Sequence, residues 1–315
     1  MDSRRGAERG ANMGQRVWQS PRIEVRGYAH RMEHLDQYPD LPRVESPEDE
    51  AHGRAWLSQS FDRVERLHSA FADMSVRQRS SLHGHDLATP REPLSHQVYT
   101  AVGVAFDNLR TIKVLMADAH VLPVFAHFGL IRNALEAPGV ALWMLGPTSR
   151  DVRVLRSLQL AYEDRLDQWS LELEVDGNPY VSLPPTDAIA NRLLEIRDLR
   201  PVNSGVSLNP PSITKRLAVA QAFVPPQEVT LLASWKIMSG VAHGRRGTLY
   251  NLLDRTVTGV NPLGAEIRMT SSVRTIATMY MVAEKYLLAL MNLMILRGYV
   301  YAPRDDQENR PPTSP

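Results

Sequence analysis

Residues 127–145 have the sequence HFGLIRNALEAPGVALWML, in which apolar side chains cover most sides of a helix. A helix that is apolar almost all round is buried on most sides, so we expect this segment at the centre of the fold. Pro123 is expected near its first turn, where a missing N–H does no harm. Pro138 lies inside it and is expected to kink the helix or break it in two. Gly146 and Pro147 should end it.

Amphipathic segments on either side predict further helices, because apolar residues recur there at three- to five-residue steps. Three such stripes are Trp56, Phe61, Val64, Leu67 and Phe71; Val98, Val102, Phe106, Leu109, Ile112 and Met116; and Leu155, Leu158, Tyr162, Leu166 and Trp169. Shorter helices are expected at 187–199, 212–223 and 227–241, and a long last helix at 268–297. The candidates for strands are the short segments 23–25 and 256–260. The predicted fold class is therefore all-α, an antiparallel helical bundle over residues 49–300.

Both ends of the chain are expected to be disordered. Residues 1–48 lack any sustained hydrophobic period and predict a flexible arm, with a basic first half and an acidic second half. The basic half could tether a nucleic acid or a partner, or be an ordinary solvated tail, which we favour. Residues 301–315 predict a disordered tail.

Composition excludes several classes of function. The 315 residues include 36 Lys and Arg against 35 Asp and Glu, so no global charge attracts nucleic acid or anionic lipid. The absence of cysteine removes disulfides, zinc–thiolate sites, iron–sulfur clusters and thiol nucleophiles. The apolar stretch 286–296 is too short to cross a bilayer, and the N-terminal residues contain no secretory signal. We expect a cytoplasmic protein that does not enter a membrane.

The first candidate site is the pair Arg132 and Glu136, which a spacing of four places on one face of the central helix. Burying a charge is costly unless it is paired, so the two side chains should meet each other or polar groups of neighbouring helices. In a functional interpretation, Arg132 binds an anion and Glu136 acts as a base. In the structural interpretation, which we favour, the pair fixes the register of the bundle.

The second candidate lies in the segment SGVAHGRRG, residues 239–247. Gly244 suits the left-handed position that ends a helix. Small residues before it would let another helix approach, so that His243 points into the contact and Glu136 accepts its proton. His243 would then be a general acid–base, with Ser239, Arg245 and Arg246 as binding residues and the arginines holding phosphate. Alternatively, His243 makes an interhelical hydrogen bond and the arginines stabilise the helix dipole.

The segments LIRNALEAPGVALWML and WKIMSGVAHGRRG together resemble uncharacterised helical proteins of actinobacteria, which are similar in turn to the HEPN-like class of helical bundles. That class includes RNA-cutting toxins and phage-defence proteins. The resemblance covers about residues 95–298. HEPN ribonucleases carry an Arg four to six residues from a His on one helix, and here no Arg stands so before His243. Cleavage of RNA would need Arg132, Glu136 and His243 to converge from two helices.

Other sequence patterns give weaker support for a functional site. The run His83, His85 and Asp86 resembles a metal-binding motif, but a solvated loop is the prediction. Residues 212–241 have helix–turn–helix proportions with few bases, which argues against DNA binding. The sequence contains no nucleotide, cofactor or zinc-protease motif, so no cofactor or metal is predicted.

The predicted function is a non-catalytic binding or interaction module, acting as a homodimer or with a protein partner. The alternative is a HEPN-like ribonuclease or defence protein that uses the Arg132, Glu136 and His243 cluster, with RNA as its substrate.

Overall fold

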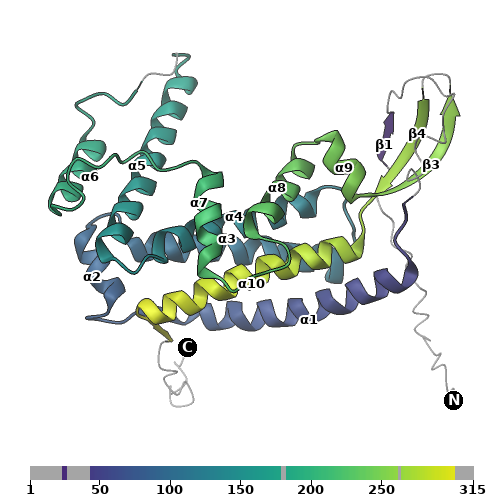
Figure 1. Cartoon of the computed structure of the whole chain (residues 1–315), viewed down its shortest axis with the longest axis horizontal. Helices are drawn as coiled ribbons and strands as arrows, with labels where there is room; N and C mark the ends of the chain where they lie inside the picture. The colour runs from purple at the N-terminus through teal and green to yellow at the C-terminus, as the bar shows by residue number, and fades with distance from the viewer. Residues whose placement is uncertain (1–22, 27–42, 179–181, 262–263, 302–315) are drawn as a thin grey trace, which may run out of the picture.

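The computed structural model describes residues 23–26, 43–178, 182–261 and 264–301. Four helices that pack on one another form the main core (Figure 1). They are α1 (Pro47–Ala72), α3 (Leu94–Lys113), α4 (Ala126–Leu145) and α10 (Val273–Arg297). The prediction of an all-α helical bundle is confirmed.

Helix α4 lies at the centre, as predicted, and contacts α3, α10, α7 and α8. It remains one continuous helix through Pro138, so the prediction of a break there is wrong. Pro138 and the adjoining Gly139 are both buried against neighbouring helices, whose packing compensates for the missing backbone hydrogen bond. The helix also begins later than predicted, because Pro123 lies in the preceding loop, where its carbonyl accepts from Ser271 Oγ at 3.3 Å.

One layer of shorter elements covers α4. These are α7 (Ile213–Ala220), the 3₁₀ turn Gln221–Phe223, α8 (Leu231–Ala242) and α9 (Arg246–Leu252). The predicted helix 227–241 starts only at Leu231, because Thr230 accepts a hydrogen bond from the N–H of Ala233 and caps it there.

A second, smaller apolar cluster joins α5 (Arg150–Val175) to α6 (Ala188–Asp198), which rise together from one end of the bundle (Figure 1). Its buried members are Val154, Leu158, Ala161, Leu193, Ile196 and Leu208. Arg165 on α5 binds Asp187, the N-cap of α6, at 2.8 Å. This lobe borders the groove described below.

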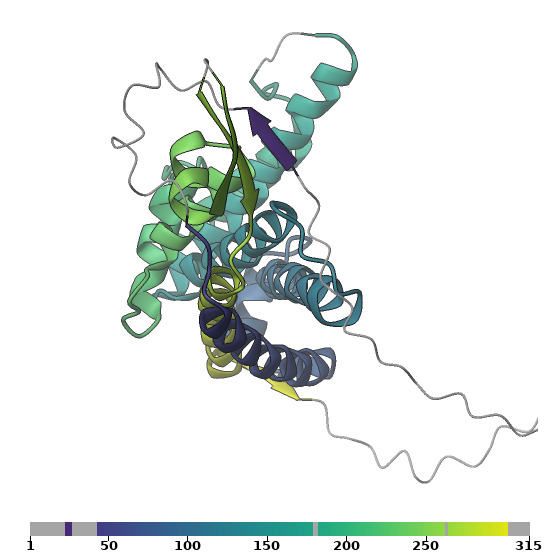
Figure 2. The same ribbon diagram turned by 90° about the vertical axis from the view of Figure 1, so that its right-hand side faces the viewer.

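A small sheet occupies the opposite end, above the starts of α1 and α10 (Figure 2). The antiparallel hairpin of β3 (Asp254–Asn261) and β4 (Gly264–Thr270) receives β1 (Ile23–Arg26) along β4. Both strand candidates are confirmed, but the predicted start of the last helix at residue 268 is wrong. Ile267 and Met269 alternate with the more exposed Arg268, which is a strand period, and Ser272 caps α10.

The His83–Asp86 run is not a loop, because it belongs to α2 (Ser81–Ala88). Ser80 caps this helix, and Leu82 and His85 are buried. Two three-residue strands, β2 (Met74–Val76) and β5 (Tyr299–Tyr301), pair beside it.

Part of the predicted flexible arm is ordered. Residues 23–26 form β1, and the backbone of Arg43 pairs with that of Arg255 on β3. Glu45 then binds the start of α10. Residues 1–22 and 27–42 of the arm, and residues 302–315 of the predicted tail, lie outside the described residues.

Helix α10 is long and apolar enough, by length and composition alone, to cross a membrane. Within the bundle, however, 56% of its most apolar window is buried. Glu284 on this helix lies inside the core and is bound by Arg63 of α1 at 2.5 Å, which agrees with the role of a core helix.

Candidate functional site

Arg132 and Glu136 form the predicted pair, with Nη2 and Oε2 2.9 Å apart. Their side chains are 27% and 31% exposed, so the pair is only partly buried, although it lies on a helix that is apolar on most sides. Both residues lie at the edge of the buried face of α4. Because the pair keeps contact with water, it contributes only about 0.3–0.5 kcal/mol to stability.

The residue that α8 supplies to this pair is Trp235. Its indole Nε1 donates a hydrogen bond to Glu136 Oε2 at 2.6 Å, and the guanidinium of Arg132 lies 5.3 Å from the centre of its ring. This role of Trp235 was not among the predictions from the sequence. One signal was available, because Trp235 stands four residues before Ser239 and so lies on the same face of α8.

His243 does not join the cluster. It is the exposed C-cap residue of α8, eight residues after Trp235, which corresponds to about 12 Å along the helix. The predicted proton transfer from His243 to Glu136 is therefore not supported by the geometry. Gly244 does end α8 as predicted, with a φ of 65°. The N–H of Arg245 bonds to the carbonyl of Gly240 at 2.8 Å, as in a Schellman motif.

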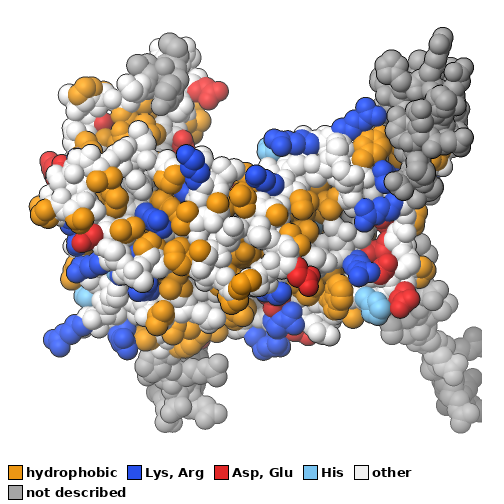
Figure 3. Space-filling view, in the orientation of Figure 1, with side chains coloured by type: hydrophobic (Ala, Val, Ile, Leu, Met, Phe, Trp, Pro, Cys, Tyr) orange, Lys and Arg blue, Asp and Glu red, His pale blue; other side chains and the backbone are white. Residues whose placement is uncertain are grey.

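The candidate binding residues Ser239, Arg245 and Arg246 are also separated. Ser239 is buried on α8, whereas both arginines are exposed at the start of α9. Arg246 lies over the ring of Tyr250, 5.3 Å from its centre. Basic side chains gather above this turn in Figure 3. They form a surface apart from the Arg132 and Glu136 pair.

Glu136 also lines a groove of about 680 Å³ that is bounded by α3, α4, α5 and α7. Partly exposed apolar side chains line part of it: Ala101, Val104, Ala137, Val140, Leu160 and Ile213. Polar side chains line the rest: the carboxylates of Glu92, Glu136, Glu163, Asp164 and Asp167, with Arg216, His96, Gln97, Thr100 and Asn133. We call this the acidic groove.

The charges in the acidic groove are only partly compensated. Arg216 binds both oxygens of Glu163, at 2.6 and 2.8 Å. Asp164 and Asp167 form no ion pair with any described residue. Desolvation, followed by the charges of Glu163 and Asp167, raises the pKa of Asp164. The groove therefore holds repulsion between carboxylates that a bound cation would relieve.

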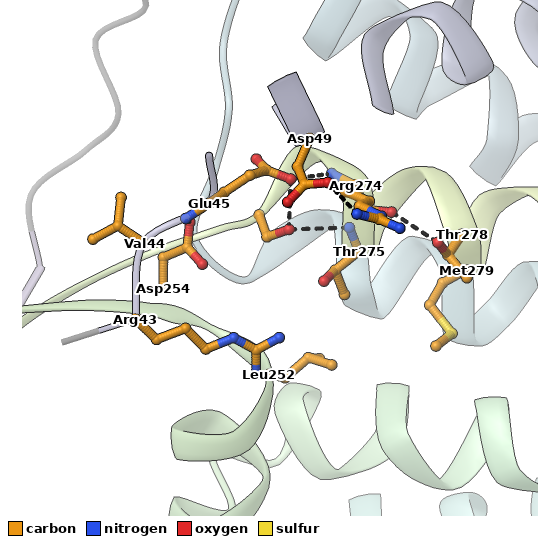
Figure 4. Close-up of a pocket in the computed structure, with 11 residues that line it drawn as sticks. Arg43, Val44, Glu45, Asp49, Leu252, Asp254, Arg274, Thr275, Thr278 and Met279 are labelled. Carbon is orange, nitrogen blue, oxygen red and sulfur yellow. Dashed lines mark hydrogen bonds and ion pairs between the residues drawn. The ribbon is translucent and has the colours of Figure 1, made fainter. Parts of the chain in front are cut away.

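A second hollow, of about 360 Å³, lies where the sheet meets α1 and α10 (Figure 4). Glu45 points at the start of α10, where its carboxylate accepts from the N–H groups of Val273 and Arg274 at 2.8 and 2.7 Å. The positive end of α10 is thus already bound by a side chain of the chain itself. Burial raises the pKa of the adjoining Asp254, which accepts from the N–H of Glu45.

The run His83, His85 and Asp86 on α2, which resembles a metal-binding motif, uses two of its side chains for hydrogen bonds within the protein. His85 is buried and accepts from Arg153 Nε at 2.9 Å, and Asp86 accepts from the N–H of Ser95 at 2.9 Å. Within the described ranges, no group of three His, Asp or Glu side chains is placed to hold a metal ion.

Comparisons with protein-family models, with curated protein sequences and with solved structures found no match to this chain.

Proposed function

We propose that this protein is a non-catalytic binding module whose acidic groove holds a basic, amphipathic segment of a protein partner. The observation that carries the proposal is the combination of unpaired Asp164 and Asp167 with partly exposed apolar side chains in one groove. A segment with lysine or arginine on one side and apolar residues on the other would complement both.

The groove is large enough to be a binding site, and its charges and apolar side chains together favour a segment of chain as the ligand. A volume of about 680 Å³ is within the range of about 300–1,000 Å³ that small ligands occupy. The groove is bounded by helices from four parts of the chain, so it is held by the packing of the bundle rather than by one loop. A pre-formed groove binds with a smaller entropic cost than one that must order on binding.

Catalysis receives less support from the same contacts. A ribonuclease built from Arg132, Glu136 and His243 needs all three around one phosphate, and Glu136 is instead occupied by Arg132 and Trp235. RNA cleavage, homodimerisation and a cytoplasmic location stay predictions from the sequence. Induction in cells with measurement of growth and RNA integrity tests the first, and sedimentation equilibrium tests the second.

The proposal is tested with a short helical peptide carrying lysines on one face and leucines on the other, titrated into the full chain by calorimetry. We expect binding that weakens about tenfold or more in the double variant Asp164→Asn/Asp167→Asn, because two attractions to the ligand are lost. The matched control is Asp62→Asn/Asp107→Asn, which removes two exposed carboxylates of α1 and α3 outside the groove lining.

A peptide of opposite charge and the comparison of the two double variants test whether the acidic groove binds cationic segments. A peptide with glutamates in place of the lysines should not bind. If the wild-type chain ignores the basic peptide, or if both double variants bind it like the wild type, the acidic groove is not a site for cationic segments.

A further inference from the structure

The described arginines differ in their partners, and two sets of them can be distinguished, to which Arg66, Arg245 and Arg246 do not belong. Ten of them form ion pairs with carboxylates: Arg54, Arg63, Arg110, Arg132, Arg165, Arg192, Arg197, Arg200, Arg216 and Arg274. Five others gather at the α2 end of the bundle, and none of these forms an ion pair with a described residue. They are Arg77, Arg79, Arg150, Arg153 and Arg297, which we call the arginine corner.

Three segments far apart in the sequence build this corner. Arg153 on α5 donates from Nη2 to Ser81 Oγ of α2 at 3.3 Å, and Arg150 donates to the carbonyl of Gly84. The N–H of Arg77 binds the carbonyl of Gly298, which follows Arg297 at the end of α10, at 2.8 Å. The guanidinium groups of Arg150, Arg153 and Arg297 therefore converge through tertiary packing. The backbone contact of Arg77 brings the exposed Arg77 and Arg79 to the same end of the bundle.

The positive charge of the corner is not neutralised from within. Burial, followed by the charges of Arg297 and Arg150, lowers the pKa of Arg153 to about 10. His85, which accepts from Arg153, has its pKa lowered to about 4 by burial and is neutral at pH 7. Asp86 on α2 accepts from the N–H of Ser95 and keeps its negative charge, which offsets only one of the five positive charges.

The end of α4 offers partial compensation. Arg153 and Arg297 both donate to the carbonyl of Pro147, at distances of 2.5 and 3.0 Å. Pro147 lies two residues beyond Leu145, where α4 ends, and the end of a helix carries about half a negative charge, against three neighbouring guanidinium groups. A net positive charge remains, and the exposed side chains Arg77, Arg79 and Arg150 carry it to the surface. Basic side chains are visible at this end of the molecule, at the lower left of Figure 3.

We infer that the arginine corner binds the phosphate backbone of a nucleic acid. Guanidinium groups match phosphate oxygens in geometry and charge, and several of them spread over three segments suit a chain of phosphates better than one anion. A lipid surface is less suited, because membrane-binding elements alternate bases with a broad apolar face. Here the large apolar side chains exposed near the corner come from separate elements, Leu87 on α2, Leu296 on α10 and Tyr301 on β5, and not from one amphipathic helix.

This inference stands apart from the proposed function, because the acidic groove would repel the same ligand. Its test uses a fluorescent single-stranded oligouridylate, mixed with the full chain and followed by anisotropy from 50 to 200 mM salt, the range over which phosphate contacts weaken strongly. The triple variant Arg77→Glu/Arg79→Glu/Arg150→Glu should bind at least tenfold more weakly. The slope of the logarithm of the binding constant against the logarithm of salt concentration should also become shallower by about 2, because each of three lost phosphate contacts contributes about 0.7.

The matched control reverses three other basic side chains that are exposed and outside the corner, Arg66→Glu/Lys236→Glu/Lys285→Glu. It should weaken binding much less than the corner variant does. Circular dichroism checks that each variant is folded, and the milder triple Arg→Gln variant of the corner replaces the first if that one unfolds.

Three outcomes would overturn the inference. The wild-type chain could fail to bind the oligouridylate and duplex DNA at 50 mM salt. The control could lose as much affinity as the corner variant, which would place binding elsewhere. The corner could instead be needed for binding to vesicles of phosphatidylglycerol while nucleic acid is ignored, which would identify a membrane site.

Discussion

Trp235 Nε1 donates a hydrogen bond to Glu136 Oε2 at 2.6 Å, and so joins α8 to α4 across 99 positions of sequence. The same carboxylate is held by Arg132. The two interactions leave Glu136 on the wall of the acidic groove with a fixed orientation. The contact that organises this part of the molecule is therefore made by a tryptophan and not by the histidine that ends α8.

Trp235→Phe should lower the free energy of unfolding by about 1–2 kcal/mol, because it removes one hydrogen bond to a charged acceptor and part of a buried ring. Urea unfolding at pH 7 measures the change. Glu136→Gln is the comparison, since its amide oxygen can still accept from the indole, and it should cost less. A larger cost for Glu136→Gln would mean that the charge, and not the indole bond, stabilises this contact.

Glu284→Ala should lower the free energy of unfolding by about 2–3 kcal/mol, since it leaves Arg63 without its carboxylate at the α1–α10 contact. The expected loss is below that of a fully buried pair because the Arg63 side chain is 42% exposed. The exposed pair of Glu50 with Arg54 serves as the control, and Glu50→Ala should cost about 0.5 kcal/mol or less. Equal losses in the two variants would contradict this account.

Gly139→Ala should destabilise the protein by about 1–3 kcal/mol, because the added methyl group would collide with Leu217 and Leu231 where α7 and α8 pack on α4. Gly103→Ala on α3 is the matched control. No atom lies within 4 Å of its added methyl group, so this change should stabilise the helix by about 0.5–1 kcal/mol. Thermal melting should move in opposite directions for the two variants.

Stability should fall steeply as the pH is lowered below about 6.5, the ordinary pKa of histidine. Burial lowers the pKa of His85 to about 4 and that of His127 to about 3, so both are neutral when folded and protonated when unfolded near pH 5. Above pH 6.5 both histidines are neutral in the folded and unfolded states and do not oppose folding. As the pH falls from 6.5 toward their folded-state pKa values, only the unfolded chain takes up the protons, so the free energy of unfolding decreases. His127→Leu should reduce proton uptake on unfolding at pH 5 by about one, measured from urea unfolding against pH. An unchanged slope would show that His127 is not buried neutral.

Asp164 should oppose folding at neutral pH. Its pKa is raised in the folded state, so the folded protein holds this proton more tightly than the unfolded chain, and stability falls as the pH rises through the folded pKa. Asp164→Asn should therefore melt at a higher temperature than the wild type at pH 7 and at the same temperature at pH 3, below the ordinary aspartate pKa of about 3.9. The basic peptide should produce a similar gain in the wild type at pH 7. A lower melting temperature for the variant at pH 7 would contradict this.

The placement of the main helices follows from local pattern. The stripe through Phe61 and Val64 and the apolar run from Ile131 to Leu145 have the periods of α1 and α4, and those periods depend on residues only a few positions apart. Ser272 and the alternation of Ile267 with Met269 could have marked the end of β4. Their signal was hidden because apolar residues at 267, 269, 273 and 276 also approximate a helical spacing.

The sequence by itself determined the all-helical class, the central position of α4, the Arg132 and Glu136 pair and the termination of α8 at Gly244. Each depends on side-chain periodicity or on backbone sterics within about two turns of helix. Only the tertiary structure decided which distant groups meet: Trp235 with Glu136, the carboxylates of α5 with Glu136 in the acidic groove, and Arg297 with Arg153 at the arginine corner. Those meetings depend on how the helices cross, and crossing is set by packing between side chains remote in sequence, which no local pattern contains.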